Sequence, residues 1–282
     1  MNDLPHPQDL SRLDGPVLIF GGPYSNLAAT RAMRRRAAEL DIPPRRVICT
    51  GDVVAYCGEP RETVQMVRDW GIAVVRGNCE ESLADAAPDC GCGFVEGTLC
   101  SALAVDWYNF ANARLVEDER AWMRDLPRAL HFELNDRSIL VVHAGVDSLN
   151  RFIFPATPAE VKQRELQLSG SDILIGGHSG IPSAQRFGMR AWLNAGAIGI
   201  PANDGTRDGW YLLLVPEGER IRCQWQRLTY DPAPSIAAMR AAGLTAGYAK
   251  ALESGLWPSL DVLPPQDRAR RGIPIVLKDL VL

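Results

Sequence analysis

Short apolar runs and helix-like segments alternate over the first 75 residues, and this alternation constrains the fold more than any other feature. The runs have the length and apolar character of strands that are buried on both faces. The segments between them contain no glycine or proline, and Asn26 is a natural N-cap for the first. The predicted strands are residues 17–20, 45–49 and 72–75, and the predicted helices are residues 27–40 and 61–70. This order predicts a parallel sheet with helices on its faces.

The rest of the chain predicts more elements of both kinds. Asn135-Asp136-Arg137 separates two apolar runs in the manner of a hairpin loop. Further strands are expected at 130–134, 138–142, 173–178, 191–193, 210–215 and 221–228, and helices at 105–113, 117–126, 158–168, 234–242 and 245–253. Prolines 258, 264 and 265 predict an extended final stretch. We expect a loose lead-in over residues 1–15, a domain over 16–230, and a helical tail over 231–282 that belongs to the same domain.

Charge and cysteine content exclude several classes of protein. The 282 residues include 30 basic and 34 acidic side chains, a net charge of -4, which gives no strong case for nucleic-acid binding. No stretch of 18 or more apolar residues predicts a membrane span. The N-terminal residues lack the pattern of a signal peptide, so the seven cysteines are expected to be thiols in a cytoplasmic protein. A homo-oligomer is compatible with the sequence.

Four polar side chains follow apolar strands at the points where the strands end. They are Asp52, Asn78, His143 and His178. In α/β sheets, residues just past the carboxyl ends of strands line the ligand crevice. One carboxylate, one amide and two imidazoles form a mixed oxygen and nitrogen set that suits Mn, Fe or Zn. The alternative is that each residue only caps a helix or forms a turn, a common role of Asp and Asn.

Five sequence blocks around these residues occur in a recognisable order. They are residues 51–58 (GDVVAYCG), 76–80 (RGNCE), 142–145 (VHAG), 177–182 (GHSGIP) and 194–201 (NAGAIGIP). Together they resemble the calcineurin-like metallophosphoesterase superfamily, in particular its bacterial phosphodiesterase branch. The resemblance covers residues from about 16 to about 255, including Tyr230-Asp231 and two short helices after it. It implies an α/β fold, a four-layer α/β/β/α sandwich with a metal site at the strand ends.

The chain departs from the family pattern at four positions. Gly22 and Tyr24 stand where the family has an Asp and a His, Gly180 stands where it has the last His, and Cys79 replaces the His next to the substrate. In the family two metals share the Asp that corresponds to Asp52. The resemblance therefore implies that the first metal has lost three of its four protein ligands. It implies that the second metal keeps all four: Asp52, Asn78, His143 and His178.

The resemblance favours a metal-dependent hydrolase of a phosphomonoester or phosphodiester. It would use a metal-bound water at one retained divalent transition metal (Mn, Fe or Zn), with Asp52, His143 and Cys79 as catalytic residues. Its substrate would be a phosphorylated small molecule or nucleotide. The alternative is a degenerate protein of the same fold that binds a phosphorylated ligand or a partner without turnover.

The cysteines leave a second question open. Thiolates could fold over the emptied site and hold a second, softer metal, with Tyr24 as a phenolate ligand. The candidates are Cys57, Cys79, Cys90, Cys92 and Cys100. The Cys90-x-Cys92 spacing differs from the Cys-x-x-Cys of ordinary zinc sites, which favours buried thiols without a ligand role.

Overall fold

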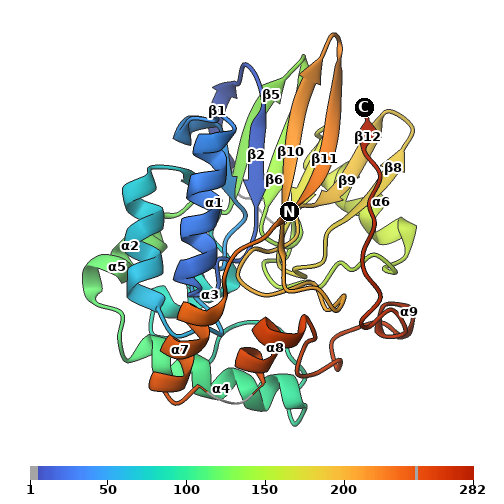
Figure 1. Ribbon diagram of the computed structural model, residues 1–282. Coiled ribbons are helices and arrows are strands. Elements are labelled where there is room, and N and C mark those ends of the chain that lie inside the picture. Colours follow the sequence, from blue (N-terminus) through green and yellow to red (C-terminus); the bar gives the residue numbers. More distant parts are fainter. Residues whose placement is uncertain (1–5, 245–246) are drawn as a thin grey trace.

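Two six-stranded sheets pack face to face and carry helices on their outer sides (Figure 1). The computed structural model describes residues 6–244 and 247–282. Helices α1 and α2 lie on one side of the sandwich and α6 on the other. The predicted four-layer α/β/β/α fold is therefore confirmed. Within the described part of the chain, no helix has the length and apolar character needed to cross a bilayer.

One sheet has the strand order β12-β11-β10-β2-β3-β4. Its strands are β2 (Val17–Phe20), β3 (Val47–Cys49), β4 (Ala73–Val74), β10 (Gly209–Glu217), β11 (Arg220–Leu228) and β12 (Leu280–Val281). Strands β2, β3 and β4 run parallel, whereas β10 is antiparallel to both β2 and β11. The carboxyl ends of β3 and β4 therefore lie at the same edge of this sheet.

The other sheet has the strand order β1-β5-β6-β7-β9-β8. Its strands are β1 (Gln8–Arg12), β5 (Ala129–Leu134), β6 (Arg137–Val142), β7 (Ile173–Gly176), β8 (Ser183–Phe187) and β9 (Arg190–Asn194). Strands β5 and β6 form the predicted hairpin, and β6, β7 and β9 run parallel. The carboxyl ends of β6 and β7 thus also meet at one edge.

The helices are α1 (Leu27–Glu39), α2 (Pro60–Trp70), α3 (Asn78–Ala84), α4 (Leu99–Asn112), α5 (Glu117–Asp125), α6 (Ala159–Ser169), α7 (Ala233–Ala241), α8 (Tyr248–Ser254) and α9 (Pro265–Arg268), with a 3-10 turn at Pro44–Arg46. Helix α1 begins as predicted, because the Asn26 side chain accepts a hydrogen bond from the amide of Ala29. Helix α2 ends at Gly71, which adopts the left-handed conformation that glycine allows. Helices α4, α7 and α8 lie below the sheets in Figure 1.

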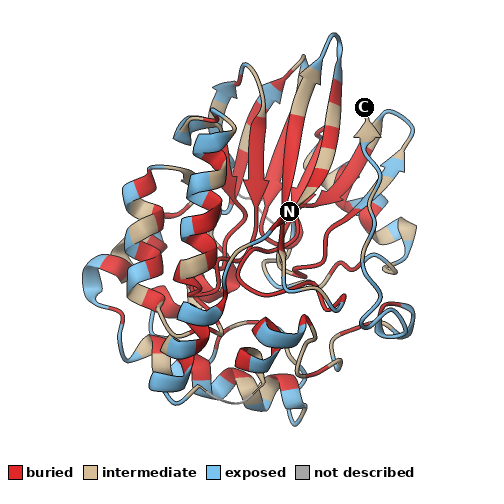
Figure 2. Ribbon diagram, viewed as in Figure 1, coloured by how far each residue is buried: buried red, intermediate tan, exposed pale blue. Residues whose placement is uncertain are grey.

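Alternate side chains of the central strands enter different hydrophobic cores, so these strands are buried on both faces (Figure 2). Leu18 and Phe20 of β2 pack with the helices, while Val17 and Ile19 pack between the two sheets. On the far side, Leu140 and Val142 of β6 pack with α6. Ile236, Met239, Ala249 and Leu252 of α7 and α8 join the core around α1 and α2.

Several elements differ from the sequence predictions. The lead-in is not loose throughout, because Gln8–Arg12 pairs in parallel with β5. Strands β8 and β12 and helices α3 and α9 were not predicted, and α4 begins at Leu99 rather than near residue 105. Strands β1 and β8 are short and carry polar residues, and β12 is only two residues long, so their pairing comes from neighbouring strands rather than from local pattern. In the helix predicted over 245–253, residues 245 and 246 lie outside the described chain.

Candidate metal centre

The four predicted side chains come from loops at one end of both sheets. Asp52 follows β3 and Asn78 opens α3 after β4, whereas His143 follows β6 and His178 follows β7. Asp52 and His178 have φ angles of 55° and 27°, which are uncommon for residues other than glycine. Each such backbone conformation costs about 1–3 kcal/mol and persists where the surrounding structure enforces it. The fold therefore holds two of the four residues in strained positions at this point.

The structure brings all four side chains together around the Nε2 atom of His143. That atom lies 3.0 Å from Asn78 Oδ1, 3.0 Å from His178 Nδ1 and 3.3 Å from Asp52 Oδ2. All four residues are buried or nearly so. Two donor atoms that bind one transition metal at about 2.0–2.2 Å stand roughly 3 Å apart. The spacing therefore matches a single coordination sphere.

The orientation of these groups also fits a cation. His143 Nδ1 lies 2.7 Å from the carbonyl oxygen of Thr50, so in the neutral ring Nδ1 carries the proton and Nε2 presents a lone pair. Asn78 Nδ2 donates to the carbonyl oxygen of Cys90 at 2.9 Å, which leaves Oδ1 facing the cluster. His178 turns Nδ1 toward the same point, 3.0 Å from His143 Nε2. A cation would satisfy lone pairs that otherwise face one another.

When no ion is bound, the close packing of these side chains shifts their pKa values. Burial opposes the charge on His143, but the charge and hydrogen bond of Asp52 raise its pKa above the ordinary value. Burial and the charge of His143 lower the pKa of His178 to about 3, so His178 is neutral at physiological pH. Burial opposes ionisation of Asp52 as well, yet the charge of His143 keeps the pKa of Asp52 low. The pairing with Asp52 therefore favours the charged form of His143, whereas His178 stays neutral.

Glu80, a residue without a role in the sequence-based predictions, holds the backbone next to this cluster. Its carboxylate accepts hydrogen bonds from the backbone amides of Asp52 at 2.7 Å, Val53 at 2.8 Å and Gly77 at 2.9 Å. Burial and the neighbouring Asp52 raise the pKa of Glu80 to about 7. Glu80 is the third residue of α3 and caps its first turn, a position that the pattern of an acidic residue after Gly77 could have indicated. It joins the loops after β3 and β4.

Tyr24 lies beside the space next to Gly22 and Gly180, two positions where the resemblance described above implies lost ligands. A Cβ atom on Gly22 would lie only 2.2–2.7 Å from three atoms of the Tyr24 ring, and a Cβ on Gly180 would lie 3.6 Å from the Tyr24 hydroxyl. Burial and the charge of Asp52 raise the pKa of Tyr24 well above its ordinary value. The phenol is therefore neutral, which argues against the phenolate ligand considered from the sequence.

A small cavity opens next to Tyr24 and His178. It measures about 60 Å³, and its walls are mostly aromatic and small side chains, with no Asp, Glu, Lys or Arg among the lining residues. Its aromatic walls include Tyr24, Tyr56, Phe94, Phe152, Tyr248 and Trp257. The Phe152 ring lies 4.3 Å from the His178 ring, centroid to centroid. The cavity therefore suits an apolar group next to the cluster.

Cys79 lies behind the cluster rather than in the cavity. Its side chain is fully buried, it does not line the cavity, and its backbone amide donates to Asp52 Oδ1 at 3.2 Å. Burial, together with the charges of Asp52 and Glu80, raises the pKa of the Cys79 thiol well above its ordinary value. This position does not suit the proton transfer expected from the sequence.

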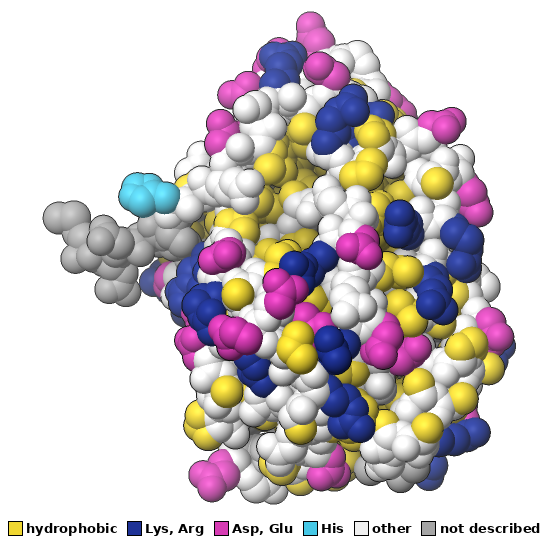
Figure 3. Space-filling view, turned by 90° about the vertical axis from the view of Figure 1, so that its left-hand side faces the viewer, with side chains coloured by type: hydrophobic (Ala, Val, Ile, Leu, Met, Phe, Trp, Pro, Cys, Tyr) yellow, Lys and Arg dark blue, Asp and Glu magenta, His cyan; other side chains and the backbone are white. Residues whose placement is uncertain are grey.

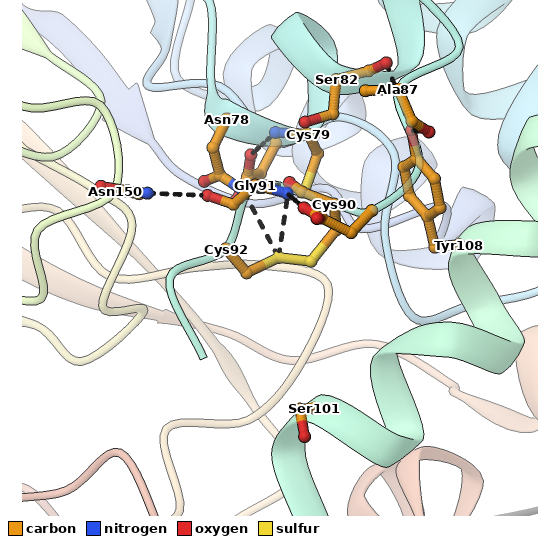
Figure 4. The surroundings of a disulfide bond; sticks show 12 residues. Asn78, Cys79, Ser82, Ala87, Cys90, Gly91, Cys92, Ser101, Tyr108 and Asn150 are labelled. Carbon is orange, nitrogen blue, oxygen red and sulfur yellow. Dashed lines mark hydrogen bonds between the residues drawn. A yellow bond between two sulfur atoms is a disulfide. The ribbon is translucent and has the colours of Figure 1, made fainter. Parts of the chain in front are cut away.

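The expectation that every cysteine is a thiol is wrong for one pair. Cys90 and Cys92 form a disulfide next to Asn78 (Figure 4). Cys49, Cys57, Cys79, Cys100 and Cys223 are free and buried. Among the described residues, the one group of three or more His, Cys, Asp and Glu side chains spaced for a metal is Asp52, His143 and His178. Over the described part of the chain, no cysteine thus belongs to a group with metal-ligand spacing.

Known proteins match the chain at the level of family and fold. One solved relative is a metallophosphoesterase from Sphaerobacter thermophilus, which is 22% identical with a TM-score of 0.68 over 86% of this chain and 100% of its own. Another is a hypothetical protein from Pyrococcus horikoshii, which is 17% identical with a TM-score of 0.70 over 86% of this chain and 98% of its own. A comparison with curated proteins gave no match. The calcineurin-like phosphoesterase superfamily domain matches residues 25–216, so the chain belongs to that superfamily.

Proposed function

We propose that this protein hydrolyses a phosphate ester and that one divalent transition metal, Mn, Fe or Zn, is held by Asp52, Asn78, His143 and His178. The observation that carries the proposal is the convergence of their lone pairs on one point, at separations of 3.0–3.3 Å from His143 Nε2. An ion held there would polarise a phosphoryl oxygen and acidify water. Membership of a phosphoesterase superfamily supports this class of reaction.

The other residues have separate roles in this proposal. Glu80 and Cys79 position Asp52 through the hydrogen bonds of their carboxylate and backbone amide. Tyr24 is neutral and borders the cavity, so its hydroxyl can donate a hydrogen bond to a phosphoryl oxygen there. We assign Tyr24, rather than Cys79, to contact with the substrate.

The cavity favours a phosphodiester over a phosphomonoester. A monoester is largely dianionic at neutral pH, whereas a diester carries one negative charge. No Lys or Arg lines the cavity to balance a second charge, and its aromatic walls fit an apolar substituent. We therefore infer a small diester, including a nucleotide, as the preferred substrate. Basic and acidic side chains are interspersed on the molecular face in Figure 3, so among the described residues that face offers no continuous basic surface for a nucleic-acid backbone.

A second candidate is a protein that binds a phosphorylated ligand or partner without turnover. The observation that favours it is Tyr24, whose ring takes the space of the lost Asp and His ligands. A single ion cannot clamp the attacking and leaving oxygens symmetrically.

Turnover of p-nitrophenyl phosphate, bis(p-nitrophenyl) phosphate and cyclic nucleotides with added Mn²⁺, Fe²⁺ or Zn²⁺ separates the two candidates. We expect the diester to be hydrolysed faster than the monoester, and Asp52→Asn and His143→Ala to abolish turnover. His131→Ala, on β5 and outside the cluster, is the matched control and should retain activity. Tight binding of these esters without turnover under every metal would select the second candidate.

A further inference from the structure

The Cys90–Cys92 disulfide closes a three-residue loop directly over Asn78 (Figure 4). The loop belongs to an irregular segment between α3 and α4. The loop packs closely against α3, since a Cβ on Gly91 would lie 2.8 Å from Ser82 Oγ. On its other side, the Gly91 carbonyl oxygen accepts a hydrogen bond from Asn150 Nδ2 at 3.0 Å. The loop therefore touches α3 on one side and the loop that carries Asn150 on the other.

Both cysteines of this loop bind the side-chain amide of Asn78. Asn78 Nδ2 donates to the carbonyl oxygen of Cys90 at 2.9 Å and lies 3.3 Å from Cys92 Sγ. These contacts fix which way the amide points, and so direct Oδ1 toward His143 Nε2. Because Asn78 is fully inside the protein, few other groups can orient it. The position of a proposed ligand thus depends on the closed loop.

The disulfide is reachable from one side. Cys90 and Cys92 are 5% and 2% exposed, but both line a groove of about 540 Å³, which Tyr108 and Ser101 also border. Exchange requires a thiolate to approach one sulfur of the bond. The groove provides room for such a reagent on the side away from Asn78.

We propose that Cys90–Cys92 is a thiol–disulfide exchange site for a dithiol, and that its reduction lowers the metal affinity of the neighbouring cluster. The inference rests on the proposed function only through Asn78 as a metal ligand. One thiolate of the dithiol attacks a cysteine sulfur, the S–S bond breaks, and the other cysteine leaves as a thiolate that takes a proton. The second thiol of the reagent then resolves the mixed disulfide, so two electrons and two protons pass to the protein and the reagent becomes a disulfide.

Reduction affects the metal through Asn78. Two separate thiols no longer hold the Cys90 carbonyl and Cys92 Sγ in one arrangement around the amide, so Asn78 Oδ1 gains freedom to turn from the cluster. Loss of a partner that orients a metal ligand typically lowers metal affinity about 10- to 100-fold. We expect a change of that order between the oxidised and reduced proteins.

Titration with Mn²⁺ alone tests this without any substrate. Protein is prepared oxidised, or reduced with dithiothreitol and desalted without oxygen, and alkylation followed by mass spectrometry establishes the state of Cys90 and Cys92. We expect the oxidised form to bind Mn²⁺ about 10- to 100-fold more tightly. The double variant Cys90→Ser/Cys92→Ser should bind Mn²⁺ as weakly as the reduced form, and dithiothreitol should not change its affinity. Cys223→Ser, on β11, should show the same Mn²⁺ affinities as the unmodified protein in both states.

Several outcomes would overturn the inference. They are equal affinities in the two states, tighter binding in the reduced state, or no disulfide in the oxidised preparation. The comparison of states in the unmodified protein holds even where the double variant fails to fold. Asn78→Ala separates this inference from the proposed function, because unchanged Mn²⁺ affinity in that variant would refute the ligand assignment itself. Weakened affinity in Asn78→Ala, together with equal affinities of the oxidised and reduced unmodified protein, would refute only the switch.

Discussion

The buried ring of Tyr24 packs against Gly22, where the resemblance implies a ligand of a second metal. Its ring would lie within 2.7 Å of any Cβ on Gly22, and burial raises the pKa of its phenol well above the ordinary value. Glycine at position 22 and the ring of Tyr24 are thus coupled, since an Asp at position 22 has no free space while Tyr24 remains. This coupling predicts that the lost site can be rebuilt only when Tyr24 is changed too.

We expect Gly22→Asp alone to destabilise the fold by about 2–5 kcal/mol, because the side chain overlaps the Tyr24 ring and φ is +43°. Gly71→Asp is the matched control: its φ is +70°, but no atom lies within 4 Å of its added Cβ. The triple variant Gly22→Asp/Tyr24→His/Gly180→His removes the overlap with the Tyr24 ring but keeps positive φ angles at positions 22 and 180, so it should recover only part of the loss and bind two metals per chain instead of one. Urea denaturation and elemental analysis measure both effects. Two metals in the unmodified protein would contradict the argument.

The proton on His143 makes metal binding depend on pH. The charge and hydrogen bond of Asp52 outweigh burial and raise the pKa of His143, so the ring holds a proton until the pH exceeds that raised value. A metal must displace it, and affinity should therefore rise as the pH rises through the pKa. His178, with a pKa of about 3, releases no proton. Calorimetry of Mn²⁺ binding in buffers of different ionisation enthalpy should show release of about one proton per ion below this pKa; release of two would contradict it.

Helix α3 joins the loops after β3 and β4 through Glu80. Four backbone amides from two loops donate to one buried carboxylate, which also caps the first turn of the helix that carries Asn78. Helix α3 has only seven residues and is not stable by itself, so its position depends mainly on the Glu80 side chain. Displacement of α3 would move Asn78 and the backbone beside Asp52 together.

Glu80→Ala should therefore destabilise the protein by at least about 3 kcal/mol, because four buried donors lose their acceptor. Glu80→Gln keeps one oxygen and should lose less. Glu81→Gln, the next residue of the same helix and partly exposed, should change stability by less than about 1 kcal/mol. Urea denaturation measures the three variants. An equal effect of Glu80→Ala and Glu81→Gln would show that the network does not hold the loops.

The elements that could be predicted are those with a strong local pattern. The runs at β2, β3 and β6 are apolar on both faces, and α1 has a cap and no helix breaker. Strands β1 (QDLSR) and β8 (SAQRF) are polar edge strands, and only their neighbours define them. The ends of buried strands likewise located Asp52, Asn78, His143 and His178. The packing of Tyr24, the hydrogen bonds of Glu80 and the contact of Cys92 with Asn78 depend on tertiary structure, which no spacing in the sequence reveals.

The four residues of the cluster divide equally between the two sheets. Asp52 and Asn78 follow strands of the sheet that contains β2, and His143 and His178 follow strands of the sheet that contains β6. A continuous apolar core lies between the sheets. An ion bound at one end would add a second link, because its ligands come from both sheets. Metal binding should therefore stabilise the whole sandwich rather than one loop.

Removal of the metal should lower the stability of the entire molecule in one step. An ion that binds only the folded state, at a free concentration of 100 times its dissociation constant, stabilises that state by about 2.7 kcal/mol. Chelation with EDTA should lower the urea midpoint, and Mn²⁺ should restore it. Far-ultraviolet and near-ultraviolet circular dichroism should shift together, because the ligands come from both sheets. Asp52→Asn should lose the response to Mn²⁺, while His131→Ala should keep it. A metal effect on the near-ultraviolet transition alone would mean that the ion orders only the loops around it and does not join the two sheets.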